Sequence, residues 1–423
     1  DWEKGIGKER VPVFDKAWRV EEPNTFGTDE YIKLCRKVGC EPYICTNAGT
    51  GSAEEMSNWL EYCNLDHEGQ YARKRIANGH KDPYHVRYWS IGNENYGFWE
   101  IGAKERQEWG SLVREAAKMM KHVDPDIELT AAALADLDWT LQLLKSAAPF
   151  LDWISIHGYW DEIHETNDAA GYDPCMVYTE SVSDQVDRVR GLLTALGLQK
   201  KIRIAFDEWN LRQWYHPGVH NLVQSSDPSY YIGERDRNDD NSLYTMADAV
   251  FSACFLNMCL RNCDLVGMAG FAPTVNTRGC IFTYDKGIVL RSTYYVFDLY
   301  VHYLGDIVLN TWDEETPVRS LKGVSGEKTD VHMADAVVTA FRDSGKLAMA
   351  LVNKEKSSAC EVELELEGEC GEAVIHYIDG ESEDDYNDIG RNHIMIREKK
   401  LGRFENRMRV TLPAHSVSVL SIG

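Results

Sequence analysis

The chain has 423 residues, 43% of them hydrophobic, which is long enough for one large domain and a smaller one. Asp and Glu number 68 against 45 Lys and Arg, so the net charge is −23. This charge opposes binding to nucleic acid and to anionic membranes, and it is typical of a soluble globular protein.

Between about residue 28 and residue 305, short apolar runs alternate with amphipathic helices. This alternation predicts parallel β/α units in a barrel or a doubly wound sheet. Thr28 is expected to cap a helix that stops at Gly39, and two further helices are expected at about residues 109–120 and 184–197. Six strands are expected, each nearly all apolar as burial on both faces requires: residues 42–46, 86–91, 127–134, 153–157, 202–206 and 265–271.

After residue 305 the pattern changes to alternating polar and apolar residues, separated by Gly, Asp and Asn turns. Strands are expected at residues 331–342, 347–353, 360–366, 373–378, 408–412 and 416–422. This pattern predicts an antiparallel β-sandwich that packs against the preceding domain and carries no obvious catalytic cluster.

Eleven cysteines are an odd number, and several fall within expected helices and strands rather than in loops. This distribution favours a reducing compartment and free thiols. Cys259 and Cys263 are one helical turn apart, but no second Cys or His pair completes a zinc site, so neither a metal nor a cofactor is expected. The chain begins at Asp1 with no signal peptide and no membrane span, so it is expected to start inside a longer sequence or after processing.

Two acids directly follow predicted strands, where β/α barrels place their active-site residues. Glu94 follows the strand at residues 86–91, and Glu208 follows the strand at residues 202–206. Hydrolysis of a glycosidic bond commonly needs two carboxylates, one to protonate the leaving oxygen and one to attack or to activate water. A single such acid is more often a helix cap or an ion-pair partner, so it is the pair that indicates catalysis.

Polar and aromatic residues accompany both acids. Asn93 can offer its amide to a sugar hydroxyl, and a third strand end carries His157 and Tyr159, which could hydrogen-bond the nucleophile and hold it ionised. Nearby tryptophans could stack on sugar rings and exclude water: Trp99, Trp209 and Trp214.

These motifs, in this order and spacing, resemble the arabinofuranosidases of glycoside hydrolase family 51, in clan A. The resemblance rests first on Gly92-Asn93-Glu94, His157-Gly158-Tyr159 and Asp207-Glu208-Trp209-Asn210. Further matches extend over essentially the whole chain: Gly5-Ile6-Gly7, Ala17-Trp18, residues 24–30, 47–51 and 61–64, Val275-Asn276 and residues 293–295.

The resemblance implies a (β/α)8 TIM-type barrel in residues 1–305, with about six strands visible, and a jelly-roll-like β-sandwich in residues 306–423. It implies a retaining double displacement with Glu208 as nucleophile and Glu94 as general acid/base. Asn93 would contact the sugar hydroxyl next to the anomeric carbon, and His157 and Tyr159 would flank Glu208. Further candidate substrate-binding residues are Trp18, Trp99, Trp214 and Asn47.

The sequence departs from the family pattern in two places. Family members have two more barrel strands before the point that corresponds to Asp1, and these strands carry a sugar-binding Glu and Asn. Three explanations for the missing strands stay open: the sequence is truncated, another chain supplies the strands, or a smaller barrel rearranges. Truncation is favoured. Pro273 stands where the family usually has Gln, which removes a possible side-chain donor near the sugar.

The predicted function is removal of terminal α-L-arabinofuranosyl residues from arabinan or arabinoxylan oligosaccharides. By resemblance, the protein is expected to be cytoplasmic and a homo-oligomer, either a hexamer or a trimer of dimers. Two alternatives stay open: a β-xylosidase or endoglucanase of the same clan, and a weak or inactive carbohydrate-binding remnant.

Overall fold

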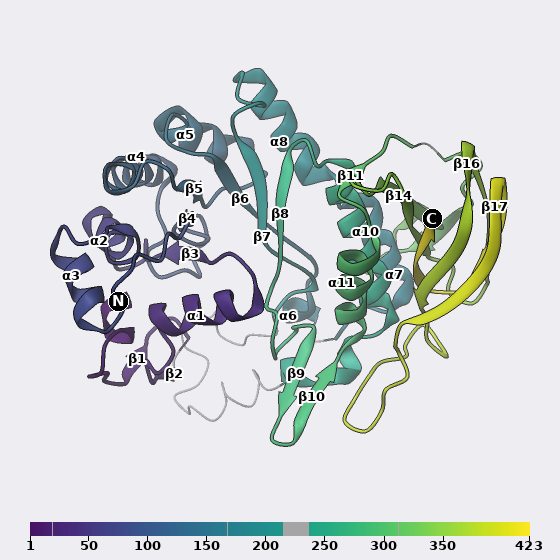
Figure 1. The fold of residues 1–423 in the computed structure, drawn as a ribbon, viewed down its shortest axis with the longest axis horizontal. Helices are drawn as coiled ribbons and strands as arrows, with labels where there is room; N and C mark the ends of the chain where they lie inside the picture. Colours follow the sequence, from purple (N-terminus) through teal and green to yellow (C-terminus); the bar gives the residue numbers. More distant parts are fainter. Residues whose placement is uncertain (19, 167, 215–236, 312) are drawn as a thin grey trace. The chain divides into compact units, whose positions relative to one another are not determined.

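The structure is a computed structural model that describes residues 1–18, 20–166, 168–214, 237–311 and 313–423 (Figure 1). These residues form two compact units. The first unit consists of residues 1–157 and 186–206, and the second of residues 158–185 and 207–423. Strands β6 (Trp153–Asp161) and β7 (Arg203–Arg212) each begin in the first unit and end in the second.

The first unit is built on a parallel sheet whose strands are mostly buried, apart from the exposed Cys45 and the half-buried first residue of each strand. Three strands pair side by side in chain order: β3 (Tyr43–Thr46), β4 (Tyr88–Ile91) and β5 (Glu128–Ala131). The start of β6 continues this sheet through a parallel bridge between Ala132 and Ser155. The predicted strands are thus confirmed to within a few residues, because burial on both faces requires nearly continuous apolar runs.

Helices pack beside this sheet, and α4 lies against both α2 and α5. The helices are η1 (Trp2–Gly5), α1 (Thr28–Val38), α2 (Ala53–Asn64), α3 (Gln70–Ala77), α4 (Arg106–Val123), α5 (Leu137–Ala147) and most of α8 (Asp184–Ala195). A short hairpin of β1 (Val13–Asp15) and β2 (Val20–Glu22) was not predicted. The predicted end of α1 at Gly39 is confirmed, since that glycine adopts a left-handed φ of 77°.

The expected cap of α1 was wrong by one residue. The residue at the N-cap position is Gly27, and Thr28 is already helical. A Cβ atom at Gly27 would lie 1.8 Å from the backbone oxygen of Gly5, so only glycine fits there. The Thr28 hydroxyl instead accepts a hydrogen bond from the Trp59 indole at 3.0 Å. Close packing of two backbone segments therefore decided the cap, rather than the side-chain preference of a threonine.

The strands β6 and β7 extend well beyond their predicted ends at residues 157 and 206. The added residues are partly polar, which is why an apolar pattern did not include them. Their polar side chains nevertheless find partners within the second unit, where β8 (Val266–Phe271) pairs with β7. A buried polar residue can occupy a strand when its hydrogen bonds are made by neighbouring strands.

Three buried charged side chains join the ends of β6 and β7 to the start of α10 (Met246–Arg261). The Arg212 guanidinium donates to Asp161 and to both oxygens of Asp248, the latter at 3.1 and 3.2 Å. All three residues are at most 3% exposed. Burial raises the pKa of Asp248, and the neighbouring guanidinium opposes this shift. Direct pairing therefore offsets the cost of removing these charges from water.

Replacing Arg212 with leucine is expected to lower the free energy of unfolding by about 3–5 kcal/mol, because two carboxylates would stay buried without their cation. Urea denaturation followed by tryptophan fluorescence measures this change. Arg319→Leu is the control, since Arg319 is 58% exposed in its pair with Glu355 and its removal should cost less than about 1 kcal/mol. Equal effects of the two substitutions would contradict a stabilising role for the buried pairs.

The remaining elements of the second unit before its C-terminal sheet are mostly helical. They are α6 (Ile163–Thr166), α7 (Tyr172–Tyr178), η2 (Thr179–Ser181), η3 (Arg237–Asp239), η4 (Asn241–Leu243), α11 (Ser292–Tyr303) and the hairpin β9 (Ile281–Tyr284) and β10 (Gly287–Leu290). The long helix α10 is buried over almost its whole length. None of the helices in the described ranges has the length and apolar character needed to cross a bilayer.

The C-terminal region contains an antiparallel sheet of six strands in the order β11-β14-β15-β18-β16-β17. Its strands are β11 (Ile307–Val308), β14 (Ala334–Ala340), β15 (Leu347–Asn353), β16 (Cys360–Ile378), β17 (Arg397–Leu412) and β18 (Ser416–Ile422), and β12 (Val318–Lys322) pairs separately with β13 (Lys328–His332). The fold class is thus an α/β region with parallel strands followed by an antiparallel C-terminal sheet, as predicted.

One apolar core contains residues from strands near both ends of this sheet. Val338 lies on β14 and Phe404 on β17, yet both belong to the same buried cluster, together with Met349 and Leu420. Because β14 and β17 are far apart in the strand order, the sheet must curl to bring them together. A single curled sheet therefore encloses the core that the alternating pattern indicated.

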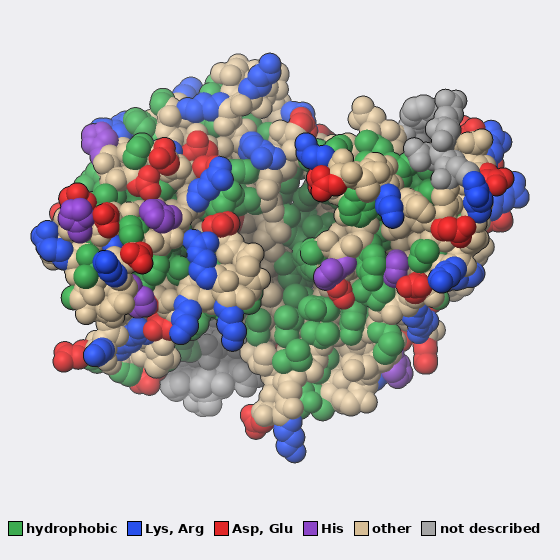
Figure 2. All heavy atoms as spheres, viewed as in Figure 1, with side chains coloured by type: hydrophobic (Ala, Val, Ile, Leu, Met, Phe, Trp, Pro, Cys, Tyr) green, Lys and Arg blue, Asp and Glu red, His purple; other side chains and the backbone are tan. Residues whose placement is uncertain are grey.

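Three strand boundaries differ from the prediction. The run at residues 331–342 is divided between β13 and β14, the runs at 360–366 and 373–378 are one strand, and the run at 408–412 is only the end of β17. Residues 397–407 of β17 are mostly exposed and polar or charged, so they lack the apolar alternation on which the prediction relied. Acidic and basic side chains mix over β16 and β17 at the right-hand edge of Figure 2.

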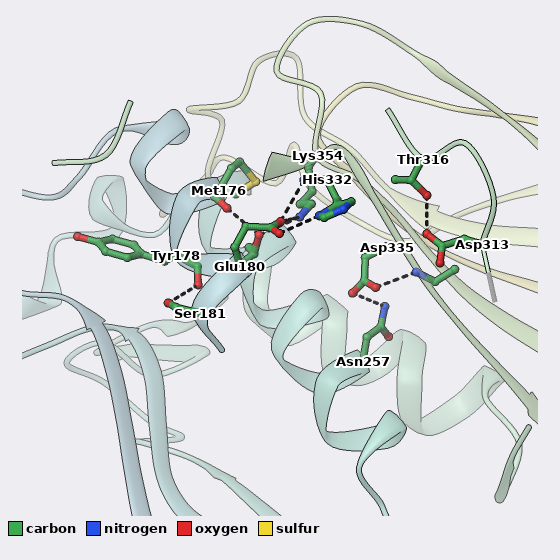
Figure 3. Close-up of polar contacts among 12 residues, drawn as sticks. Met176, Tyr178, Glu180, Ser181, Asn257, Asp313, Thr316, His332, Asp335 and Lys354 are labelled. Carbon is green, nitrogen blue, oxygen red and sulfur yellow. Dashed lines mark hydrogen bonds and ion pairs between the residues drawn. The ribbon is translucent and has the colours of Figure 1, made fainter. Parts of the chain in front are cut away.

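Polar contacts within the second unit attach η2 and α10 to the C-terminal sheet (Figure 3). The Lys354 ammonium, 4% exposed, donates to Glu180 at 2.9 Å, and His332 Nδ1 lies 2.9 Å from the same carboxylate. Asn257 on α10 donates to Asp335 on β14 at 3.2 Å. Helices before residue 305 and the sheet after it therefore share one compact unit, and the predicted domain boundary stays a prediction.

Candidate active site

Glu94 lies directly after β4, in a tight turn of the first unit. It has a φ of 44°, which is uncommon for a residue with a side chain and costs energy that the surrounding structure must offset. The side chain of Asn95, 2% exposed, holds this turn, because its oxygen accepts from the Asn93 N–H at 3.1 Å and its amide donates to the Gly102 carbonyl at 3.2 Å. Such local strain at an acid marks a candidate functional residue.

Three side chains hydrogen-bond the Glu94 carboxylate. His157 Nδ1 lies 2.7 Å from Oε1, the Trp99 indole N–H donates to Oε2 at 2.6 Å, and the Tyr96 hydroxyl donates to Oε1 at 3.4 Å. Burial acts to raise the pKa of Glu94, but the hydrogen bonds and the charge of His157, with the other two donors, lower it below its ordinary value. The contact between His157 and Glu94 was not predicted, since the sequence indicated only a partner for the nucleophile.

Aromatic rings form the surface next to Glu94. Trp99 is 37% exposed and meets Tyr96 and Phe98 edge-on, with ring centroids 6.1 and 5.4 Å apart. Phe98 is 69% exposed and was not singled out in the sequence, although it directly precedes Trp99. Asn93, one of the predicted sugar contacts, has its amide 3.4 Å from the Glu100 carboxylate. The first unit therefore presents a partly buried acid beside an exposed aromatic surface.

Glu208 lies on the part of β7 that belongs to the second unit. The Tyr159 hydroxyl, on β6, donates to Glu208 Oε2 at 2.7 Å, a contact that the sequence predicted. Because side chains alternate along a strand, Asn210 and Arg212 share the face of Glu208, while Trp209 points the other way. This face of β7 carries a line of polar side chains, each with a partner on a neighbouring segment.

Trp209 is fully buried and stacks on Phe255 with ring centroids 4.1 Å apart. The prediction that Trp209 stacks on a sugar is therefore wrong, because the alternation of β7 turns the ring into the apolar core under α10 and α11. Phe271 and Phe297 complete its surroundings, with centroids 5.1 and 6.0 Å away. Trp209 instead fixes the position of the strand that carries Glu208.

Arg278 is a buried residue of this region that the sequence did not indicate. Its Nη2 donates to the Tyr159 hydroxyl oxygen at 2.9 Å, and its guanidinium lies between the rings of Tyr159 and Trp214, 4.4 and 4.8 Å from their centroids. Only the preceding Val275-Asn276 pair matched a motif, so local sequence offered no signal for this arginine. Trp214, a predicted residue of the pocket mouth, thus packs on a cation.

The two remaining predicted sugar contacts lie in turns of the first unit. Trp18 is 46% exposed between β1 and β2, and its backbone N–H donates to Asp15 at 2.8 Å. The Asn47 oxygen accepts from the N–H groups of Gly49 and Thr50, each at 3.0 Å, so this side chain shapes the turn after β3. The roles of both residues in binding a sugar stay predictions.

Two family models of α-L-arabinofuranosidase domains match nearly the whole chain. The Alpha-L-arabinofuranosidase 1 domain matches residues 1–176, and the Alpha-L-arabinofuranosidase C-terminal domain matches residues 207–416. An intracellular exo-alpha-(1->5)-L-arabinofuranosidase from Halalkalibacterium halodurans is 30% identical, with 89% of this chain and 75% of the relative aligned.

Solved structures agree with this match. An alpha-L-arabinofuranosidase from Thermotoga maritima, in complex with arabinose, is 31% identical with a TM-score of 0.83. The GH51 alpha-L-arabinofuranosidase from Thermotoga petrophila RKU-1 is 30% identical with a TM-score of 0.84. Each comparison covers 100% of this chain and 84% of the other.

Proposed function

The chain belongs to the α-L-arabinofuranosidases of glycoside hydrolase family 51, and on this basis we propose a retaining exo-hydrolysis of terminal α-L-arabinofuranosyl groups. The substrates would be arabinan- or arabinoxylan-derived oligosaccharides. Glu208 would be the nucleophile and Glu94 the general acid/base. The observation that carries this proposal is that Glu94 follows β4 and Glu208 lies on β7, and that different side chains hydrogen-bond each acid: His157 and Trp99 contact Glu94, and Tyr159 contacts Glu208.

The proposed reaction has two displacements. In the first, a Glu208 oxygen attacks the anomeric carbon while Glu94 gives its proton to the departing glycosidic oxygen. In the second, the Glu94 carboxylate takes a proton from water, the resulting hydroxyl bonds to the anomeric carbon, and Glu208 leaves as a carboxylate. Two inversions at one carbon leave arabinose with the anomeric configuration of the substrate.

The hydrogen bonds support this division of roles. Tyr159 donates to Glu208, which stabilises a carboxylate ready to attack. The lowered pKa of Glu94 suits its task as base in the second displacement, whereas the first displacement needs the protonated form. Activity should therefore fall on the alkaline side as Glu94 loses its proton in the free enzyme.

Replacing Trp99 with phenylalanine is expected to move the alkaline limb of the kcat/KM profile to higher pH. The substitution removes the indole N–H that donates to Glu94 Oε2, so the pKa of Glu94 should rise and the acid form should persist further. Rates with 4-nitrophenyl α-L-arabinofuranoside across pH measure the shift. Phe98→Leu is the control, because it changes the same aromatic surface without removing a donor, and an equal shift there would contradict the explanation.

We further propose roles for the other candidate residues and for the assembly. Asn93 would contact the hydroxyl next to the anomeric carbon, His157 and Tyr159 would flank Glu208, and Trp18, Trp99, Trp214 and Asn47 would bind the substrate. The catalytic region would comprise residues 1–305, and the protein would be a cytoplasmic homo-oligomer. These assignments rest on the resemblance to the family.

The proposed substrate and stereochemistry are tested together. The enzyme should release arabinose from α-1,5-linked arabino-oligosaccharides one unit at a time, and proton NMR should detect the α anomer first. 4-Nitrophenyl β-D-xyloside and cellulose oligosaccharides serve as comparison substrates. First appearance of the β anomer would exclude the retaining mechanism, and faster cleavage of the xyloside or of internal cellulose bonds would favour the xylosidase or endoglucanase alternative.

A further inference from the structure

A buried arginine stands behind the hydroxyl that contacts the proposed nucleophile. Arg278 is 2% exposed, and its Nη2 donates to the Tyr159 oxygen at 2.9 Å. The same Tyr159 hydroxyl donates to Glu208 Oε2 at 2.7 Å. These three side chains come from the β8–β9 connection, β6 and β7, and all belong to the second unit.

The chemistry of the three groups sets the direction of both hydrogen bonds. A guanidinium can only donate, and a tyrosine hydroxyl has a single proton. When Arg278 occupies a lone pair of the Tyr159 oxygen, the Tyr159 proton is directed to the carboxylate oxygen of Glu208. The hydrogen bond from a positively charged donor also polarises the hydroxyl, which strengthens its own donation.

The backbone around Arg278 is held in place by further buried groups. Arg278 Nε donates to the Ala272 carbonyl at 2.9 Å, and the Asn210 amide donates to the carbonyls of Ala272 and Arg278, each at 3.1 Å. Arg291, fully buried, donates to the Gly279 carbonyl at 2.8 Å. Asn210 is also on the face of β7 that carries Glu208, so the strand with the nucleophile and the segment with Arg278 are tied directly together.

We propose that Arg278 is a positioning residue for Glu208, acting through Tyr159, which it holds as a donor to the nucleophile. This inference rests on the proposed role of Glu208. It also concerns Pro273, which stands where the family usually has Gln and therefore lacks a side-chain donor. Arg278 lies in the same β8–β9 connection as Pro273, and it brings a different donor, the guanidinium, to Tyr159 on β6.

The test compares Arg278→Met, Tyr159→Phe and the double variant with the unaltered protein, using 4-nitrophenyl α-L-arabinofuranoside. Arg278→Met should lower kcat by roughly tenfold to 100-fold with little change in KM, because a misplaced reacting group affects the transition state more than substrate binding. The double variant should be no slower than Tyr159→Phe alone, since Arg278 has no effect without the hydroxyl. Multiplying effects in the double variant would overturn the proposal.

Arg261→Met is the matched control, because Arg261 lies in the same unit and pairs with Asp335 instead. It should leave kcat unchanged, and thermal unfolding should confirm that each variant is folded. If Arg278→Met does not fold, Arg278→Gln replaces it, since glutamine also removes the positive charge but keeps a polar side chain at the buried position. An equal loss of kcat in Arg261→Met would overturn the specific role of Arg278.

A second measurement separates this inference from the proposed function. Tyrosine labelled with 13C at Cζ reports the hydrogen bonding of each hydroxyl by NMR, and Tyr159→Phe identifies the Tyr159 signal. Arg278→Met and Glu208→Gln should both shift this signal. If the Tyr159 signal does not move in Arg278→Met, the positioning role is overturned. If the signal moves but the unaltered protein does not hydrolyse arabinofuranosides, only the proposed function is overturned.

Discussion

Glu208→Ala should lower kcat/KM for 4-nitrophenyl α-L-arabinofuranoside on the order of 10⁴-fold or more, because the substitution removes the carboxylate proposed to form the covalent intermediate. The fold should survive, since Glu208 is only partly buried and its strand is anchored by Trp209 in the apolar core. Stopped assays over hours measure the residual rate, and circular dichroism checks the fold.

Azide distinguishes a lost nucleophile from any other defect at Glu208. In Glu208→Ala, azide should enter the vacated space, attack the anomeric carbon directly and form β-L-arabinofuranosyl azide, with inverted configuration. Asp207→Asn is the control, because the neighbouring acid lies on the opposite face of β7 and should show only a small change without azide dependence. Azide product of retained configuration in Glu208→Ala would contradict the assignment of the nucleophile.

Glu94→Ala should lower kcat/KM for unactivated arabino-oligosaccharides by roughly 10²- to 10⁴-fold, the usual contribution of a general acid/base. The loss should be much smaller for the first step with 2,4-dinitrophenyl α-L-arabinofuranoside, because this leaving group departs without a proton. The comparison of the two substrates therefore separates proton donation from substrate binding.

The same variant should respond to azide with the opposite stereochemistry. In Glu94→Ala the covalent intermediate forms on Glu208 but water attacks it slowly, so azide should accelerate turnover and give α-L-arabinofuranosyl azide. Glu94→Gln keeps the size of the side chain and should be less responsive, because it leaves no space for azide. If the losses with the two substrates were equal and azide had no effect, Glu94 would not be the acid/base.

The sequence alone was sufficient for the parallel strands of the first unit and for the two acids. Strands buried on both faces must be continuously apolar, so residues 86–91 and 202–206 were visible as strands without knowledge of their partners. The active residues of β/α folds follow such strands, which pointed to Glu94 and Glu208. Local pattern and strand position therefore identified the two candidate acids, whereas the resemblance to the family supplied their proposed roles.

Only the tertiary structure decided which groups surround these acids. His157 reaches Glu94 across 63 positions of the chain, and Arg278 reaches Tyr159 across 119. The cap at Gly27 and the burial of Trp209 were likewise set by packing against distant segments. A sequence pattern reports the periodicity of one segment, whereas hydrogen-bond partners and core contacts depend on segments that folding brings together, so they had to be read from the structure.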